Sequence, residues 1–91
     1  MPLPSRLDEL IGEVVVLDAA SRYVFLGKLH EVSDGFLVLQ DADAHDLRDT
    51  NTTRDLYVLD AKLHGISVNR RQVWVRLDEI VAVTRLSEIV D

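Results

Sequence analysis

The segment from Tyr23 to Gln40 constrains the fold more than any other part of the chain. Residues 23–32 form an apolar-rich run typical of a β-strand, interrupted by Gly27, and residues 36–40 form a second such run. The residues between them, 33–35, end in Asp-Gly, a pair characteristic of tight hairpin turns. An isolated glycine inside a strand marks a bend or bulge, which a small barrel needs to turn a corner. The segment therefore predicts a bent hairpin of a small β-barrel.

Three further strands are predicted from runs of β-branched residues. Residues 13–18 are apolar on both faces, so we expect this strand to be covered on both sides. Residues 73–77 alternate between apolar and other side chains, and residues 80–86 follow after a very short turn at 78–79. Strands one to three thus lie within 13–40, and strands four and five within 73–86.

Two helices are expected, a short one near the N-terminus and one between the third and fourth strands. Residues 3–11 have one apolar face, with Ser5 as a candidate N-cap and Gly12 at the C-terminal end. For residues 54–64, a capping-box pattern of Thr52 and Asp55 precedes an i, i+3, i+7 stripe, and a C-terminal glycine follows. The stripe consists of Leu56, Leu59 and Leu63. A strand over 56–59 is the alternative, because short apolar runs are ambiguous.

The polar segment 41–53 is expected to be a loop, and residues 41–72 as a whole a variable connection that contains the second helix. Its alternating acidic residues are similar to the start of a calcium-binding loop, but Asp46 stands where that loop needs glycine and Thr52 where it needs glutamate. We therefore expect a solvated acidic loop and no metal site. The three histidines, His30, His45 and His64, lack the spacing of metal ligands and are interpreted as surface residues.

Composition narrows the class of protein. The 91 residues suffice for a single domain, 1–91, and the formal net charge of −6 argues against a general affinity for phosphate backbones. The absence of cysteine excludes disulfides, thiolate zinc sites and a cysteine nucleophile. No apolar stretch reaches the ~18–20 residues of a membrane span, and the N-terminus lacks the basic region of a signal peptide. We expect a cytoplasmic protein without a membrane partner.

Catalytic patterns are missing from the chain. No Gly-x-Ser-x-Gly motif, phosphate-binding glycine loop or Ser-His-Asp pattern is present, and four glycines leave no room for a dinucleotide-binding loop. We therefore expect no enzyme, no cofactor and no small-molecule substrate.

Two short segments match known motifs. Residues 27–34, Gly-Lys-Leu-His-Glu-Val-Ser-Asp, are similar to a motif in which Gly-x-Leu precedes an Asp in the loop between strands two and three. Residues 73–76 followed by Ile80-Val81 are similar to a second motif, and together the two segments resemble the first and second Sm motifs of the Sm/LSm-like family. The resemblance covers about residues 3–40 and 73–86. It implies a mainly β fold, a strongly bent, open five-stranded barrel of the Sm-like or SH3-like type.

The resemblance also implies a site, from which this sequence departs in part. In the family an Asn and a bulky residue hold a base, whereas the turn here carries no Asn and only Phe36 could stack on a base. Arg76 matches the family's Arg, but Leu77 replaces the Gly that follows it. The hypothetical RNA-binding residues are Phe36, Arg76, Asp34, Arg70 and Arg71. Alternatively, the basic stretch 69–72 is a solvent-exposed segment that precedes the fourth strand, and Trp74 is covered by the second helix or by a neighbouring subunit.

Assembly is the second implication of the resemblance. Sm-like subunits close into rings of six or seven by pairing the fourth strand of one with the fifth of the next, which here predicts a homo-oligomer. Independently, an open barrel leaves two strand edges unpaired, and the last strand is apolar on both faces near the chain end. The expected interface residues are Val73, Val75, Ile80, Val81 and Val83.

Two functions are compatible with these features of the sequence. The first is an RNA-associated ring that binds single-stranded RNA, favoured by the fold and by Arg76. The second is a homo-oligomeric protein-interaction scaffold that has lost RNA binding, favoured by the acidic charge and the missing Asn.

Overall fold

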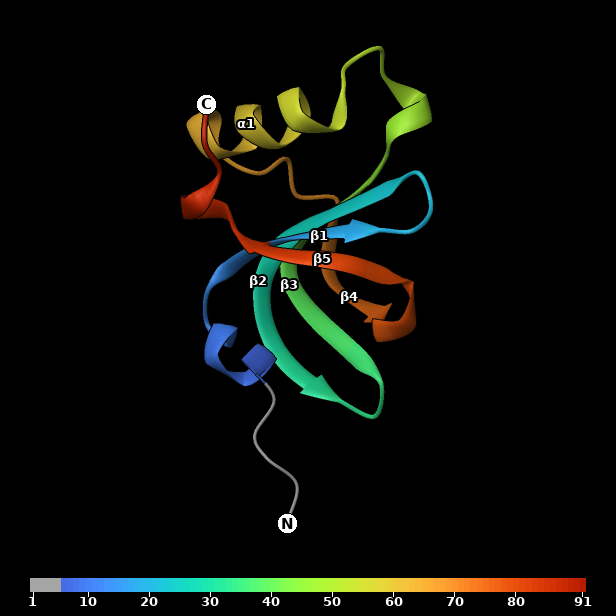
Figure 1. Ribbon diagram of the computed structural model, residues 1–91, viewed down its shortest axis with the longest axis vertical. Coiled ribbons are helices and arrows are strands. Elements are labelled where there is room, and N and C mark those ends of the chain that lie inside the picture. The colour runs from blue at the N-terminus through green and yellow to red at the C-terminus, as the bar shows by residue number, and fades with distance from the viewer. Residues whose placement is uncertain (1–5) are drawn as a thin grey trace.

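Five antiparallel strands form one sheet in the computed structural model, which describes residues 6–91 (Figure 1). The strands are β1 (Val14–Ala19), β2 (Tyr23–Ser33), β3 (Phe36–Asp46), β4 (Arg70–Arg76) and β5 (Ile80–Arg85). One α-helix, α1 (Arg54–His64), lies between β3 and β4, and four short 3-10 helices complete the described part: η1 (Arg6–Leu10), η2 (Leu47–Asp49), η3 (Leu77–Glu79) and η4 (Leu86–Glu88). The strand order is β4-β3-β2-β1-β5, so β4 and β5 are the edges of a bent, open barrel, as expected.

The bend at Gly27 has a steric cause. The register between β2 and β3 shifts once across Gly27, between Leu26 and Lys28, and again further along β2, between Leu29 and Glu31. A Cβ atom at Gly27 would lie 2.9 Å from the Ala42 Cβ atom, closer than carbon atoms pack. Position 27 therefore requires a glycine because Gln40 and Ala42 of β3 leave no room for a side chain, and the register shift there confirms the irregularity that the sequence predicts.

The hairpin turn between β2 and β3 is also confirmed. Asp34 and Gly35 both have positive φ, 52° and 81°, and Ser33 pairs with Phe36 across the turn. Two successive positive φ angles define the tight turn whose twist matches that of the flanking strands, and Asp-Gly is a preferred pair there. The turn fixes Phe36 as the first residue of β3.

Apolar side chains gather in two clusters, one on each face of the sheet. The cluster inside the barrel consists of Val15, Leu17, Leu29, Leu37, Leu39, Ala42 and Val75. The cluster between the outer face and α1 consists of Val16, Val24, Leu26, Val58 and Ala61. Because β1 contributes to both, its run of apolar residues is buried on both sides, as predicted.

The expected loop over 41–53 is wrong for residues 41–46, which continue β3. Residues 43–46 pair with the first half of β2, from Leu26↔Asp43 to Tyr23↔Asp46. The Asp-Ala-Asp-Ala pattern has low β propensity, but pairing to the long β2 strand overrides it. Strand β4 likewise begins at Arg70 rather than at residue 73, and Leu77 belongs to η3.

Helix α1 is confirmed over residues 54–64, which excludes the alternative strand. Thr53 is its N-cap, accepting a hydrogen bond from the Leu56 amide, so the predicted cap at Thr52 is wrong by one residue. Gly65 ends the helix with a positive φ of 94°. The leucine stripe faces away from the barrel, and Val58 and Ala61 are the buried residues.

The predicted N-terminal helix is shorter and tighter than expected. It is the 3-10 helix η1 over residues 6–10, and the expected cap at Ser5 lies outside the described residues. Gly12 follows with φ 95°, and its amide donates to the Leu29 carbonyl at 2.7 Å. No helix in the described part of the chain combines the length and the apolar character needed to cross a membrane.

Candidate nucleic-acid interface

Two turns that are far apart in the sequence meet at one end of the barrel. The hairpin turn carries Asp34 and Gly35, and the β4–β5 connection is formed by η3. The Leu77 amide donates a 2.8 Å hydrogen bond to the Gly35 carbonyl, which ties the two turns together. Next to this bond, Phe36 and Arg76 are register partners on β3 and β4.

A hollow of about 490 Å³ opens between the two turns. It is lined by Asp34, Gly35, Phe36, Arg76, Leu77 and Asp78. The structure thus brings together three of the five residues that the sequence singled out as RNA-binding candidates, namely Asp34, Phe36 and Arg76. We call this feature the turn hollow.

An aromatic pair flanks the turn hollow. The Phe36 and Trp74 rings lie edge to face, with centroids 5.9 Å apart and an interplanar angle of 61°. Trp74 is 64% exposed, so neither α1 nor any other described segment covers it. The sequence-based alternative of burial under the helix is therefore wrong, and the ring remains available to a ligand or a neighbouring subunit.

The charges at the turn hollow nearly balance. The Arg76 guanidinium donates to the Asp78 carboxylate at 2.9 Å, and both side chains are about two-thirds exposed. Because a guanidinium carries five N–H donors, Arg76 keeps donors free for a ligand. Asp34 adds a second carboxylate to the lining. The turn hollow therefore offers an aromatic face, hydrogen-bond donors and acceptors, but no excess of positive charge.

Arg70 and Arg71 lie at the other end of β4. Arg70 pairs with Ala42, whereas Arg76 pairs with Phe36. Six residues of extended strand separate Arg70 from Arg76 by about 20 Å. The structure does not bring these two arginines into the turn hollow, and the Arg70 guanidinium donates to the Asn69 carbonyl instead.

The expected interface residues differ in exposure. Val81 is 69% exposed and lies on β5, an edge strand. Val73, Ile80 and Val83 are half-buried against the inner cluster, and Val75 is a buried member of it, so its side chain has no surface for a neighbour to cover.

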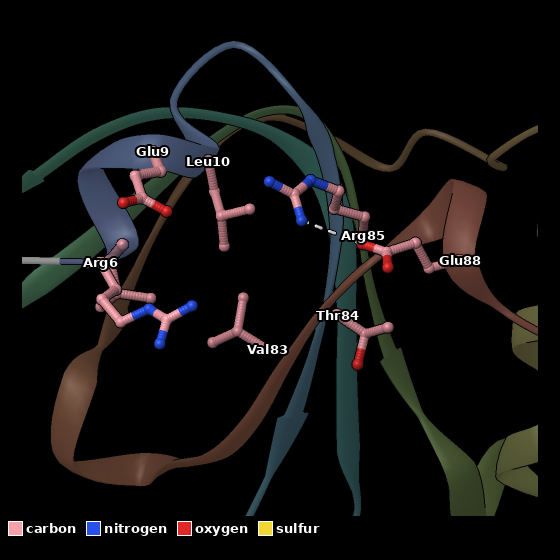
Figure 2. Close-up of a pocket in the computed structure, with 8 residues that line it drawn as sticks. Arg6, Glu9, Leu10, Val83, Thr84, Arg85 and Glu88 are labelled. Atoms are coloured by element: carbon pink, nitrogen blue, oxygen red, sulfur yellow. Dashed lines mark hydrogen bonds and ion pairs between the residues drawn. The ribbon is translucent and has the colours of Figure 1, made fainter.

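A second hollow, of about 380 Å³, lies between η1 and β5 (Figure 2). Arg6, Glu9 and Leu10 reach it from η1, and Val83 and Arg85 from β5. Hydrogen bonds from the Arg85 guanidinium to Glu13 at 2.6 Å and to Glu88 at 3.0 Å raise the pKa of Arg85 above its ordinary value. The ion pairs of Arg85 with Glu13 and Glu88 therefore lie beside the unpaired edge of β5.

A buried polar cluster, which the sequence did not predict, joins β3, α1 and Asn69, the residue before β4. Asp43 is 3% exposed and accepts hydrogen bonds from the Tyr57 hydroxyl and, at 2.9 Å, from the Asn69 side-chain amide. The Asn69 side-chain oxygen accepts from the Ala44 amide at 3.0 Å. His45 stacks on Tyr57 with ring centroids 3.7 Å apart, and so it is half-buried rather than on the open surface.

The cluster is structural in character. Burial, and then the hydrogen bond to Asp43, raise the pKa of the Tyr57 phenol. Among the residues of the described range, no group of three His, Asp or Glu side chains is placed to hold a metal ion. One feature of the sequence does point to this cluster. Acidic and apolar residues alternate over 41–44, a pattern that indicates a strand with its acidic side chains on one face.

The chain is similar to known proteins in structure but not in sequence. No family model and no curated protein sequence matches the chain. The Pyrococcus abyssii Sm protein, solved in complex with a uridine heptamer, is similar in structure with a TM-score of 0.59 at 16% identity, covering 90% of this chain and 99% of that one. A heptameric archaeal Sm protein is similar with a TM-score of 0.57 at 18% identity, covering 87% and 93%.

A third similar structure belongs to a protein complex. It is a chain of the NatC complex bound to CoA, with a TM-score of 0.57 at 15% identity, covering 99% of this chain and all of that one. All three similarities span most of this chain, which folds as five antiparallel strands in one sheet. The chain therefore has the Sm-like fold.

Proposed function

We propose that this protein forms a ring of six or seven identical subunits and binds single-stranded RNA at the turn hollow. The observation that carries the proposal is the convergence of Phe36 and Arg76, from adjacent strands, on one hollow that the Gly35–Leu77 hydrogen bond holds in place. An aromatic face can stack on a base, and a guanidinium can donate to base or phosphate oxygens.

The chemistry of the lining indicates how a base would be read. The family's Asn is missing, and the polar groups at hand are the Asp34 and Asp78 carboxylates and the Arg76 guanidinium. A carboxylate accepts hydrogen bonds, so it favours bases whose edges carry N–H groups, while the guanidinium favours carbonyl oxygens. Uracil, which has one ring N–H between two carbonyls, matches this combination of donors and acceptors.

Electrostatics favours contact with the base over contact with the phosphates. Two carboxylates outnumber the one guanidinium of the turn hollow, and the whole chain carries a net charge of −6. Binding that rests on phosphate contacts weakens steeply as the salt concentration rises. We therefore expect a shallow salt dependence for this protein, which would distinguish base stacking from a general electrostatic interaction.

The ring is supported by the two free strand edges. Both β4 and β5 lie at the ends of the sheet, so their outer backbone groups lack strand partners within the described chain. Exposed edges are a liability unless a neighbour covers them. Pairing β4 of one subunit to β5 of the next would cover both edges, bury Val81 and repeat the turn hollow around one axis.

Fluorescence titration tests the RNA site. Trp74 is the only tryptophan of the chain and contacts Phe36, so its emission reports on the turn hollow directly. Oligouridine should change the emission at low salt, and Phe36→Ala and Arg76→Ala should each reduce affinity at least tenfold. Arg70→Ala is the matched control at the far end of β4. The absence of oligouridine binding at low salt would refute the RNA site, and an unchanged affinity of Arg76→Ala would refute its location.

Sedimentation tests the ring. The native mass should be six or seven times that of one chain, and Val81→Lys on the β5 edge should lower it. A monomer at micromolar concentration would refute the assembly.

The alternative function is a protein-interaction scaffold. It is supported by the acidic net charge and by the similarity to a chain of the NatC complex. An intact ring that binds neither oligouridine nor oligoadenine would favour this alternative.

A further inference from the structure

Helix α1 exposes the leucines that a helix normally buries. Leu56 and Leu63 are 59% and 60% exposed, and Leu59 between them is half-buried. We call these three residues the leucine crest. Leu56 and Leu63 are two helical turns, or about 10 Å, apart on the same face. An apolar stripe on a helix usually faces the core, so an outward one indicates an interaction surface.

The opposite face of α1 packs the helix against the sheet. Val58 and Ala61 are buried against the outer face of the sheet, and the Tyr57 hydroxyl donates to the buried Asp43. The Thr53 cap completes the first turn. The leucine crest therefore contributes little to the packing of this chain. Because α1 is folded and packed without a partner, binding at the crest would not have to pay for forming the helix.

The basic and acidic side chains of α1 differ in their partners. Both basic residues bond to other segments of the chain: Arg54 contacts Asp18 at 3.6 Å and the Ser21 carbonyl, and the Lys62 ammonium donates to the Ile89 carbonyl. The acidic residues, Asp55 and Asp60, remain exposed on either side of the leucine crest. The only ion pair of Asp60 in the described chain is a 3.9 Å contact with His64, which is charged only when protonated.

We propose that the leucine crest docks an amphipathic helix of a protein partner that carries apolar residues at helical spacing and basic residues beside them. The i, i+3, i+7 spacing of the three leucines is the pattern by which helices recognise each other. The acidic rim matches a basic flank and repels an acidic one. A second copy of this helix fits poorly, because antiparallel pairing of the crests would bring the two Asp60 residues together.

The docking surface is separate from the turn hollow. Helix α1 lies at one end of the molecule, and the β2–β3 hairpin turn lies at the opposite end (Figure 1). RNA and a protein partner could therefore bind at the same time, and each site can be disabled without touching the other.

The experiment uses the full chain and a designed helical peptide with leucines at i, i+3 and i+7 and lysines at the flanking positions. Fluorescence anisotropy of the labelled peptide should show saturable binding. Leu56→Ser combined with Leu63→Ser should weaken it at least tenfold, and Asp55→Asn combined with Asp60→Asn should weaken it and flatten its salt dependence. Val68→Ser is the matched control, because Val68 is similarly exposed but lies outside α1. Arg76→Ala should bind the peptide normally.

Each outcome decides one part of the proposal. No binding of the lysine peptide, or equal binding by the double serine variant, overturns the docking surface. Equal binding of a peptide with glutamate in place of lysine overturns the basic partner. A fall in native mass in the double serine variant identifies a second copy as the occupant and overturns the proposal of a different protein. Circular dichroism of the variant verifies that it is folded, as expected for exposed positions.

Discussion

The two ends of the molecule are built in different ways. The end with the turn hollow consists of two tight turns. Two side chains that could contact a ligand there, Trp74 and Arg76, are largely exposed. The end with α1 depends on a buried carboxyl, Asp43, which holds Tyr57 and Asn69 from two other segments. The side chains available to a ligand are therefore spatially separated from those that support the fold. Substitutions at the two ends should therefore have opposite effects on binding and stability.

Asp43→Ala should have the largest effect on stability. It leaves the Tyr57 hydroxyl and the Asn69 amide without their shared acceptor in a partly buried place, which costs about 3 kcal/mol. Urea unfolding monitored by Trp74 fluorescence would measure the loss. RNA binding at the opposite end should survive under conditions in which the variant is folded. A loss below about 0.5 kcal/mol would contradict the supporting role of Asp43.

Gly27→Ala should be the next most destabilising change. The new methyl group would meet the Ala42 Cβ atom at 2.9 Å and the Gln40 carbonyl oxygen at 3.1 Å, so β2 and β3 must separate. Overpacking of this kind costs about 1–3 kcal/mol. Thermal unfolding would show it, and the double variant with Ala42→Gly should recover part of the loss. A fully tolerated Gly27→Ala would show that the bend does not depend on close contact.

Tyr57→Phe should cost about 1 kcal/mol at neutral pH, because it removes one hydrogen bond to Asp43. The pKa of the Tyr57 phenol is raised above its ordinary value of 10.0, so the unfolded chain releases this proton first as the pH rises. The contribution of Tyr57 is therefore complete below about pH 10 and declines above it. The difference in unfolding free energy between the wild type and Tyr57→Phe should stay constant up to about pH 10 and narrow as the pH rises above it. A constant difference would contradict this linkage.

Arg76→Ala should have the smallest effect on stability and the clearest effect on function. Its guanidinium is 64% exposed and pairs only with the exposed Asp78 in the described chain, so the unfolding free energy should change by less than about 0.5 kcal/mol. Oligouridine affinity should nevertheless fall at least tenfold. A large loss of stability would show that the turn hollow also supports the fold and would remove the contrast between the two ends.

The prediction from sequence succeeded where the signal was local. The Asp-Gly turn, the glycine bend and helix 54–64 follow from turn chemistry, steric freedom and caps within a few residues, and all three are confirmed. The prediction failed for residues 41–46, where pairing with β2 imposes a strand on a polar sequence. It also gave no sign that Asp43 is buried, because its two partners come from segments 14 and 26 residues away.

At the candidate site, too, the sequence identified individual residues but not all of their spatial relations. Sequence similarity to short motifs selected Asp34, Phe36 and Arg76, and the register of β3 and β4 places them around one hollow. The same reasoning grouped Arg70 and Arg71 with Arg76, whereas the extended strand separates them. Neighbours in the sequence are not neighbours at a site when a strand carries them apart at about 3.3 Å per residue.

Local sequence signals were sufficient to predict a bent hairpin, five strands and an inserted helix, because turns, caps and periodicity act over short distances. The buried face of α1, in contrast, is set by long-range packing. The leucine stripe predicts a helix correctly, but Val58 and Ala61 fit closer to the sheet, and the Tyr57 hydroxyl has its acceptor on β3. The orientation of an amphipathic helix depends on the shape and polarity of the surface that it meets, which local sequence does not contain.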